Sequence, residues 1–304
     1  MNNGTKQLVV LSGKGGTGKT CVTAALAHLA SKDNPPVSLV LADADVDAAN
    51  LELLIKPRIL ESQDFRGGQV AVIDEDNCQG CGVCAAVCRF EALHANNGTY
   101  RVDPIACDGC AACVTQCPED AISMHEQIVG RWFRSESRYG PLFHAALRPA
   151  QDNSGKLVTL VKQHARLLAM DEGRQLALVD GPPGIGCPVI SAASGADLAL
   201  IVAEPSRAGV HDMRRVLSTT AHFGVPSLVC INKADINPEG TIEIETYCMQ
   251  HGIPLAGRIP FDTGVIEAMV QGEPVTVYRP ESPASRALHA VWVRVSDELQ
   301  ETPA

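Results

Sequence analysis

A glycine-rich segment near the start of the chain has the residue types and spacing of a phosphate-binding loop. It follows an apolar run at 7–11, which predicts a buried strand, and precedes an alanine-rich run at 21–30, which predicts a helix. Glycines let backbone N–H groups curl around an anion, and the helix start adds free donors and a partial positive charge. We expect Lys19 to reach the β- and γ-phosphates and the Thr20 hydroxyl to hold Mg²⁺. The predicted nucleotide contacts are Gly13, Lys14, Gly15, Gly16, Thr17, Gly18, Lys19, Thr20 and Cys21.

Acidic side chains follow two further apolar runs, at 37–42 and 175–179, that predict buried parallel strands. In an open α/β sheet, the carboxyl ends of the strands border the phosphate site. Asp45 and Asp180 are therefore expected to hold Mg²⁺, directly or through water, or to orient the attacking water. Just beyond Asp180, Gly184 can present its N–H group to the γ-phosphate.

Eight of the twelve cysteines form two runs with the same spacing, C-x2-C-x2-C-x3-C, offset by 29 residues. The repeat indicates an internal duplication. Thiolates at this spacing can wrap one face of an iron–sulfur cubane, with the fourth cysteine of each run serving the other cluster. Structural zinc is the rival, although it usually takes two separated pairs per ion. The expected ligands of two [4Fe–4S] clusters are Cys78, Cys81, Cys84 and Cys117 for the first and Cys88, Cys107, Cys110 and Cys113 for the second.

Composition narrows the class of protein. The chain has 304 residues, 45% of them hydrophobic, which is enough for one large domain or two moderate ones. A net charge of −10 argues against coating nucleic acid, so no nucleic-acid partner is expected. No signal peptide opens the chain and no apolar run could span a bilayer, which predicts a cytoplasmic protein without a membrane partner. In a reducing compartment, twelve cysteines indicate metal binding or catalysis rather than disulfides.

The loop resembles the deviant P-loop of the MinD/ParA/Mrp and nitrogenase iron-protein class, because Lys14 supplies a second lysine in Lys-Gly-Gly-Thr-Gly-Lys-Thr. In that class the early lysine reaches across a dimer interface to the partner's nucleotide, which implies an ATP-sandwich homodimer. The resemblance places Asp45 in switch I, and Asp180 with Gly184 in switch II. It implies that the residues responsible for ATP hydrolysis are Lys14, Lys19, Asp45 and Asp180.

The same resemblance implies a pocket for the base. Asn232 would contact adenine, Asp235 would lie nearby, and Pro260 and Phe261 would flank the ring. The intact Asn-Lys-x-Asp is also typical of guanine recognition by GTPases, so GTP stays an alternative. The deviant lysine favours ATP.

The cysteine region resembles a bacterial two-cluster ferredoxin, with one departure: Arg89 stands where the pattern has proline, as Pro118 does in the second run. Together the resemblances predict an α/β fold. A doubly wound, mostly parallel sheet of the P-loop NTPase type would occupy 1–68 and 128–304. An inserted α+β domain of the bacterial-ferredoxin type would occupy 69–127.

These resemblances imply an iron–sulfur protein that binds and hydrolyses ATP, with ATP/ADP, Mg²⁺ and two [4Fe–4S] clusters as cofactors. A nucleotide-switched dimer would be coupled to electron transfer, or to metal or cluster maturation, of a partner metalloprotein or redox protein. Hydrolysis would be slow without that partner. A second ATPase of the same family is a further candidate partner. The alternatives are an Mrp-like cluster carrier or scaffold, and a MinD-like positioning ATPase whose ferredoxin module senses redox state.

Other features have more than one interpretation. Residues 130–156 carry a surplus of positive charge and could dock a partner or the ferredoxin module, or form a solvated linker. Cys187 could be a core thiol, a redox-sensitive group or transient metal ligand, or a residue packed against a cluster. The tail at 285–299 is expected to dock on the sheet rather than bind a membrane. The cysteines expected to pack in the core are Cys21, Cys230 and Cys248.

Overall fold

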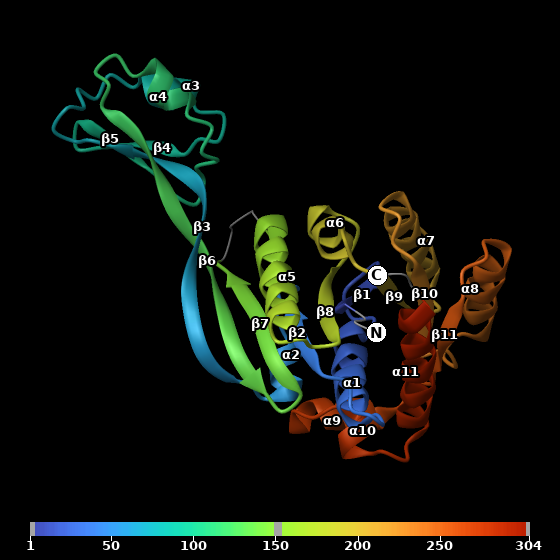
Figure 1. Ribbon diagram of the computed structural model, residues 1–304. Coiled ribbons are helices and arrows are strands. Elements are labelled where there is room, and N and C mark those ends of the chain that lie inside the picture. Colours follow the sequence, from blue (N-terminus) through green and yellow to red (C-terminus); the bar gives the residue numbers. More distant parts are fainter. Residues whose placement is uncertain (1–3, 149–153, 302–304) are drawn as a thin grey trace. The chain divides into compact units, whose positions relative to one another are not determined.

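The computed structural model describes residues 4–148 and 154–301 and divides the chain into two compact units. One, here called the sheet unit, comprises residues 1–62, 132–146 and 154–304. The other, here called the cysteine unit, comprises residues 63–131 and 147–153. Strands β3 (Arg58–Ile73) and β6 (Ile122–Ser137) each run without a break from one unit into the other (Figure 1). The cysteine unit is therefore inserted on two continuous strands.

Nine strands of the described residues form one sheet, in the order β11-β10-β9-β1-β8-β2-β7-β6-β3. All neighbours from β11 to β7 pair in parallel, which confirms the predicted doubly wound, mostly parallel sheet. The chain turns to opposite sides after β1 and β9, so a crevice opens at their carboxyl ends. The remaining strands are β1 (Lys6–Ser12), β2 (Leu39–Asp43), β7 (Gly140–Leu147), β8 (Leu176–Pro183), β9 (Leu198–Ala203), β10 (Ser227–Asn232) and β11 (Leu255–Ile259).

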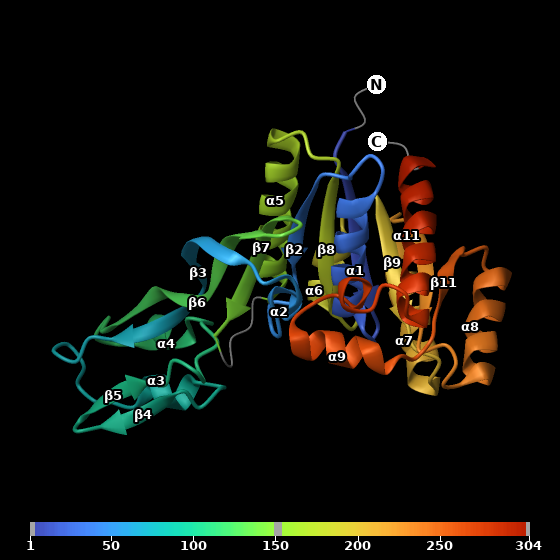
Figure 2. The ribbon, with the colours of Figure 1, turned by 90° about the horizontal axis from the view of Figure 1, so that it is seen from below.

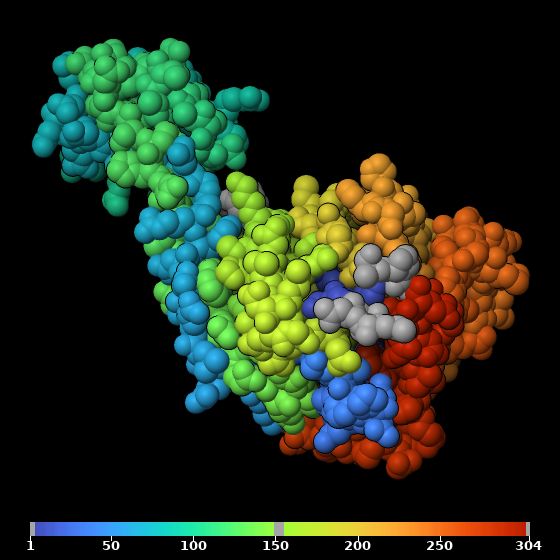
Figure 3. All heavy atoms as spheres, in the orientation of Figure 1, coloured from blue at the N-terminus to red at the C-terminus, as the bar shows by residue number. Residues whose placement is uncertain are grey.

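Helices cover both faces of the sheet. On one face α1 packs against α2, α10 and α11, and α10 packs against α9; Figure 2 looks onto this face. On the other, α5 packs against α6, α6 against α7, and α7 against α8. The side chains of α5 and α11 form part of the outer surface (Figure 3). The helix bounds are α1 (Lys19–Lys32), α2 (Leu51–Ile55), α5 (Ser154–Asp171), α6 (Cys187–Ala193), α7 (Arg207–His222), α8 (Pro238–Gln250), α9 (Thr263–Gln271), α10 (Val275–Tyr278) and α11 (Pro283–Glu301).

One large apolar cluster lies between the sheet and the helices α1 and α11. Alternate residues of the strands, such as Leu8 and Val10 of β1, are fully buried against the alanines of α1. Small side chains let this helix approach the sheet closely. From α11, Leu288 and Val291 are buried in the same cluster, so the prediction that the tail docks on the sheet is confirmed. None of the helices in the described ranges is long and apolar enough to cross a membrane.

The positively charged stretch at 130–156 is not a linker where the structure describes it. Residues 149–153 of this stretch lie outside the described residues. The rest contributes the end of β6, all of β7 and the start of α5, and Leu142 and Ala145 of β7 are fully buried. In β6, Arg131 and Arg134 flank Trp132 and Phe133, so the charged residues obscured the apolar pattern of this strand.

The cysteine unit has little regular structure beyond β3 and β6. It contains two five-residue helices, α3 (Val83–Val87) and α4 (Ala112–Gln116), and an antiparallel hairpin of β4 (Leu93–Asn96) and β5 (Thr99–Val102). The duplication is visible in the backbone, because Gly82 and Ala111 precede the two helices with φ of 79° and 59°. The left-handed conformation suits glycine but strains alanine.

Candidate functional site

The phosphate-binding loop joins the end of β1 to α1, where the parallel strands end. Gly16 and Gly18 have φ of 78° and 89°, a left-handed conformation that favours glycine. A Cβ atom at Gly18 would also collide with the amide of Asn232. Asn232 fills this space because its Nδ2 donates a hydrogen bond to the carbonyl oxygen of Thr17 at 2.7 Å. The end of β10 therefore holds the loop in its curled shape.

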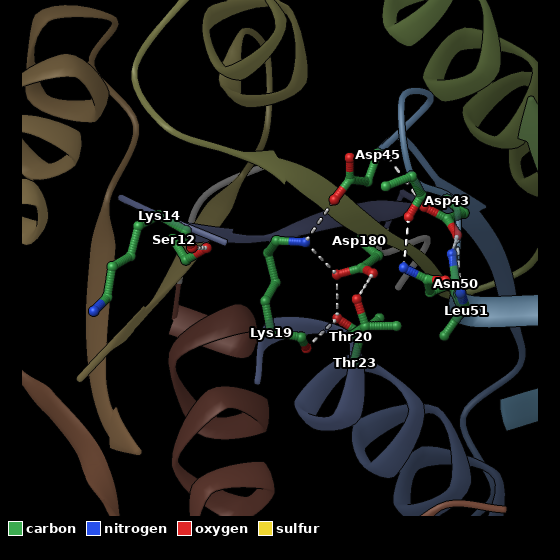
Figure 4. A network of polar contacts seen from close by, with 11 residues as sticks. Ser12, Lys14, Lys19, Thr20, Thr23, Asp43, Asp45, Asn50, Leu51 and Asp180 are labelled. Atoms are coloured by element: carbon green, nitrogen blue, oxygen red, sulfur yellow. Dashed lines mark hydrogen bonds and ion pairs between the residues drawn. The ribbon is translucent and has the colours of Figure 1, made fainter. Parts of the chain in front are cut away.

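Lys19, the first residue of α1, lies among carboxylates (Figure 4). Its Nζ is 3.5 Å from Oδ1 of Asp180 and 3.6 Å from Oδ2 of Asp45, and only 6% of its side chain is exposed. Burial lowers the pKa of Lys19, but the charges of Asp180, Asp45 and Asp43 raise it above its ordinary value overall. The ammonium group is therefore charged and stands at the place where phosphate oxygens would compete with carboxylates for it.

The Thr20 hydroxyl and the Asp180 carboxylate lie close enough together to be ligands of one Mg²⁺ ion. The Thr20 hydroxyl donates to Oδ2 of Asp180 at 2.7 Å, and the Thr23 hydroxyl donates to Oδ1 at 2.9 Å. Asp180 is fully buried at the end of β8. Hydroxyl and carboxylate oxygens are the ligands that Mg²⁺ prefers, so this pair fits the ion.

Asp43 is a residue of the site that the sequence analysis did not single out. It ends β2 in register with Asp180 on β8, and burial, followed by the charge of Asp180, raises the pKa of Asp43 to about 8. Its carboxylate accepts hydrogen bonds from the backbone N–H groups of Asp45 at 3.1 Å, Asn50 at 3.1 Å and Leu51 at 3.0 Å. Asp43 thus fixes the loop that carries Asp45 and the start of α2. The available signal was its position as the last residue of an apolar strand.

Lys14 is held within its own chain. Its Nζ lies 3.2 Å from Oγ of Ser206 and 3.6 Å from Oε2 of Glu204. Lys233 contacts the same Glu204 carboxylate at 3.7 Å. Glu204 and Ser206 follow β9, and the sequence analysis did not single them out. Lys14 is one-third exposed, so it can leave this position without opening the core.

Gly184 has its N–H group engaged. The group donates to the carbonyl oxygen of Ser12 at 2.9 Å, with φ of 98° at Gly184. To reach a γ-phosphate, as the sequence predicts, this peptide would have to leave Ser12.

Cys21 lines the same cavity as the loop, and burial, followed by the charge of Asp180, raises the pKa of the Cys21 thiol to about 11. Its role is therefore one of packing rather than of a reactive thiolate.

A cavity of about 770 Å³ extends from the loop toward α9. The predicted site residues that line it include Lys14 to Cys21, Asp45, Asn232 and Phe261, whereas Asp235 and Pro260 do not line it. Asp235 instead accepts a hydrogen bond from the backbone N–H group of Phe261 at 2.6 Å. The Phe261 ring is 46% exposed and free to stack on a base.

The comparison with known proteins agrees with this geometry. Residues 8–275 match the family described as the CobQ/CobB/MinD/ParA nucleotide binding domain. The chain belongs to this family. The uncharacterized protein MJ0578 of Methanocaldococcus jannaschii is 35% identical over 233 residues, which cover 76% of this chain and 79% of that protein.

Two further matches are a solved structure and a curated protein. The structure of the septum site-determining protein MinD complexed with Mg-ADP from Pyrococcus horikoshii has a TM-score of 0.57 and covers 98% of this chain and 99% of that one, at 19% identity. At that identity the likeness shows the fold. A cytosolic Fe-S cluster assembly factor, the Nubp1 homolog of Drosophila willistoni, is 26% identical over 144 residues, which cover 41% of this chain and 46% of that protein.

In this MinD/ParA-family chain, the eight cysteines of the inserted unit line two separate hollows. Each hollow takes three cysteines from one run and the fourth from the other, as the spacing predicts. The first hollow also contacts Tyr100 and Glu119, and the second contacts Phe90 and Asp108. Their cysteines are Cys78, Cys81, Cys84 and Cys117 in the first and Cys88, Cys107, Cys110 and Cys113 in the second.

Two of the thiols accept hydrogen bonds from the backbone. Within 4–148 and 154–301, no three His, Cys, Asp or Glu side chains converge closely enough to hold one metal ion. The N–H groups of Ala92 and Ala121 point at Sγ of Cys88 and Cys117, both at 3.4 Å. Such hydrogen bonds stabilise negative charge on sulfur.

The other cysteines of this MinD/ParA-family chain differ in exposure. Cys230 and Cys248 are fully buried, as predicted, and burial raises the pKa of their thiols to about 12 and about 11. Cys187 is exposed at the first position of α6, so it is not a core thiol.

Proposed function

We propose that this MinD/ParA-family protein binds and hydrolyses ATP as a nucleotide-switched homodimer and carries two [4Fe–4S] clusters. Its nucleotide state would control electron transfer to a partner metalloprotein, or the maturation of that partner's metal centre. The observation that supports this most directly is the sorting of eight cysteines into two hollows of four, in a chain that also holds a complete phosphate-binding loop.

The chemistry of the donors fits the proposed groups. Thr20 and Asp180 would hold Mg²⁺, with Asp45 close enough to orient a water molecule. In the cysteine unit, each set of four thiols has an apolar surrounding and, at one cysteine, a backbone N–H donor to sulfur. When bound, a [4Fe–4S] cluster supplies one-electron transfer. The proposed ferredoxin-type domain spans residues 69–127, which lie within the cysteine unit.

Hydrolysis would depend on three movements of this chain's own residues. Lys19 exchanges Asp180 and Asp45 for phosphate oxygens, which frees Asp45. Gly184 turns its N–H group away from Ser12. Lys14 leaves Glu204 and reaches the nucleotide of the partner. Because Lys14 needs a second protomer to act, an isolated chain should hydrolyse ATP slowly.

The dimer has its own test. Lys14→Ala should leave nucleotide binding intact but abolish the increase in mass that ATP causes in light scattering. Lys32→Ala is the control, because Lys32 lies at the other end of α1, away from the loop. An ATP-driven dimer of unchanged stability in Lys14→Ala would refute the role of Lys14.

The experiment that tests the whole proposal is an anaerobic potentiometric titration of the reconstituted protein, followed by EPR. It compares the protein without nucleotide, with ADP, and with a non-hydrolysable ATP analogue. A shift of about 60 mV in a one-electron couple corresponds to about 1.4 kcal/mol of coupling and would support nucleotide control. Identical potentials in all three states, or failure to bind eight iron atoms, would contradict it.

A cluster carrier is the second candidate, and the similarity to the Nubp1 homolog favours it. Four cysteines per cluster make release difficult, which weighs against this role. The two functions differ in one measurement. A carrier loses iron to an apo-ferredoxin on addition of ATP, whereas the proposed redox protein keeps it.

A further inference from the structure

The side chain of Lys14 is held by the turn that follows β9. In Figure 4 its ammonium group points away from Lys19 and Asp180. The Nζ atom instead lies 3.2 Å from Oγ of Ser206 and 3.6 Å from Oε2 of Glu204. Lys14 thus has an electrostatic partner within its own chain.

The backbone of Lys14 is fixed, whereas its side chain can move. The Ser12 hydroxyl donates a hydrogen bond to the carbonyl oxygen of Lys14 at 2.9 Å. One-third of the Lys14 side chain is exposed. Rotation about the side-chain bonds is therefore sufficient to release the ammonium group, and the loop keeps its shape when that happens.

The contact with Ser206 alone is a poor place for a cation. Ser206 is the N-cap residue of α7, and its Oγ accepts a hydrogen bond from the N–H group of Gly209 at 3.1 Å. The N-terminus of a helix carries a partial positive charge, which disfavours a lysine beside it. The Glu204 carboxylate offsets this repulsion, so we infer that Glu204 supplies the attraction that keeps Lys14 in this position.

Release of Lys14 does not leave the Glu204 carboxylate without a cation. Nζ of Lys233 lies 3.7 Å from the same Oε2 of Glu204 and also donates a hydrogen bond to the carbonyl oxygen of Gly16 at 3.3 Å. Ion pairs between partly exposed side chains contribute little free energy. The contact between Lys14 and Glu204 is therefore one that binding elsewhere can readily replace.

We propose that Glu204 is a positioning residue that restrains Lys14 within its own protomer and so sets the protein concentration at which the homodimer forms. This inference rests on the proposed function. Lys14 can pair with Glu204 or with the partner's nucleotide, but not with both at once. Dimer formation therefore requires each protomer to give up one ion pair.

The restraint also favours ATP over ADP as the nucleotide of the dimer. A triphosphate carries more negative charge than a diphosphate, so it competes better with a single carboxylate for the Lys14 ammonium group. Glu204 opposes dimer formation with either nucleotide, and the triphosphate overcomes this opposition more easily.

The test removes the charge of Glu204 and keeps its shape, in the variant Glu204→Gln. Glu298→Gln is the matched control, because the Glu298 side chain is 23% exposed against 25% for Glu204 and also forms an ion pair, with Arg294 in α11. The double variant Lys14→Ala/Glu204→Gln shows whether any effect of Glu204 requires Lys14.

Light scattering of the full chain over a range of protein concentrations gives the midpoint of dimer formation, with ADP and with a non-hydrolysable ATP analogue. Removal of the pair should favour release about threefold in each protomer, so the midpoint with the analogue should fall about ninefold in Glu204→Gln. Glu298→Gln should match the wild type. The double variant should stay monomeric, as Lys14→Ala does, and calorimetry should show ADP affinity of Glu204→Gln within about twofold of the wild type.

The outcomes separate this inference from the proposed dimer. If the wild type and Glu204→Gln dimerise at the same concentration, the restraint is wrong and the proposed dimer stands. If the double variant dimerises more readily than Lys14→Ala, Glu204 does not act through Lys14 and the inference is wrong. A loss of ADP affinity of about tenfold in Glu204→Gln would instead assign Glu204 to fixing the loop through Lys233. If neither the wild type nor Glu204→Gln dimerises with the analogue, the proposed dimer and the inference both fail.

Discussion

The two units of this chain differ in the size of the apolar core that stabilises each of them. The charged residues of the nucleotide site are set in a large apolar core, where Asp180 is fully buried and α1 packs on five or more buried strand residues. The core cluster of the cysteine unit has five buried side chains, and two of these, Cys84 and Cys113, are themselves expected ligands. Small cores rarely stabilise a fold without a metal or cross-link. We therefore expect the fold alone to position the nucleotide site, and the cysteine unit to need a bound group for its stability.

Removal of iron should have the largest effect, and we expect it only in the cysteine unit. Chelation under reducing conditions should abolish the protection of the β4 and β5 amides against hydrogen exchange, since metal-binding energy is folding energy in such units. The strands β1 and β8 should keep their protection. Retained protection in both units would show that the cysteine unit has a sufficient core of its own, and its loss from both would show that the units fold as one.

Lys19→Ala is expected to have the next largest effect, and only on the sheet unit. The substitution removes the one cation between Asp180, Asp45 and Asp43, so ATP affinity should fall about 100-fold or more and stability by about 1–3 kcal/mol. Calorimetric titration and thermal melts measure these changes. Lys32→Ala, at the other end of α1, should change neither. Iron content should stay at the wild-type value, and its loss would show that cluster binding itself depends on the nucleotide site.

Cys81→Ser is expected to affect only the cysteine unit. It should remove or convert one cluster, lowering the bound iron by about half, while nucleotide binding stays unchanged. Cys230→Ser changes a fully buried thiol of β10 and should leave iron untouched while lowering stability by about 1 kcal/mol. Iron analysis and EPR of both variants distinguish ligand from core cysteine. Equal iron in Cys81→Ser and the wild type would remove Cys81 from the ligand set.

The smallest expected effect tests strain in the cysteine unit. Ala111 has a left-handed backbone, where Gly82 stands in the first repeat. Ala111→Gly should therefore stabilise this unit by at most about 1 kcal/mol, as followed by hydrogen exchange of α4. Ala85→Gly, inside α3, should destabilise it by a similar amount. A loss of stability in Ala111→Gly would mean that the repeat tolerates this conformation without strain.

Much of the sheet unit could be predicted from local patterns. The loop from Ser12 to Thr20 has fixed spacing, and Asp180 follows an uninterrupted apolar run, so both the fold class and the phosphate end of the cavity followed from the sequence. Asp43 did not, because its importance comes from its register with Asp180, and the only local signal was its position at the end of an apolar strand.

In the cysteine unit, the grouping of the site residues was easier to predict than the strands. The cysteine spacing predicted which thiols share a hollow, because the intervals between cysteines determine which of them can ligate the same cluster. The strands around it were harder to predict. The predicted boundary after residue 68 falls within β3, and the arginines of β6 concealed a strand whose Trp132 is buried. Pairing of β3 and β6 with each other compensates for residues that are poor strand formers.

The way in which the cysteine unit is inserted has a practical consequence for protein engineering. At the inner end of the insertion, the N–H group of Asp74 donates to the carbonyl oxygen of Ala121 at 2.8 Å. The chain therefore leaves and re-enters at adjacent backbone positions, the spacing that a tight hairpin turn spans. Excising residues 75–120 and joining Asp74 to Ala121 through Asn-Gly would restore an ordinary β-hairpin. The sheet unit would keep all of its strands. Other redox modules whose two chain ends lie side by side could then be inserted at this position.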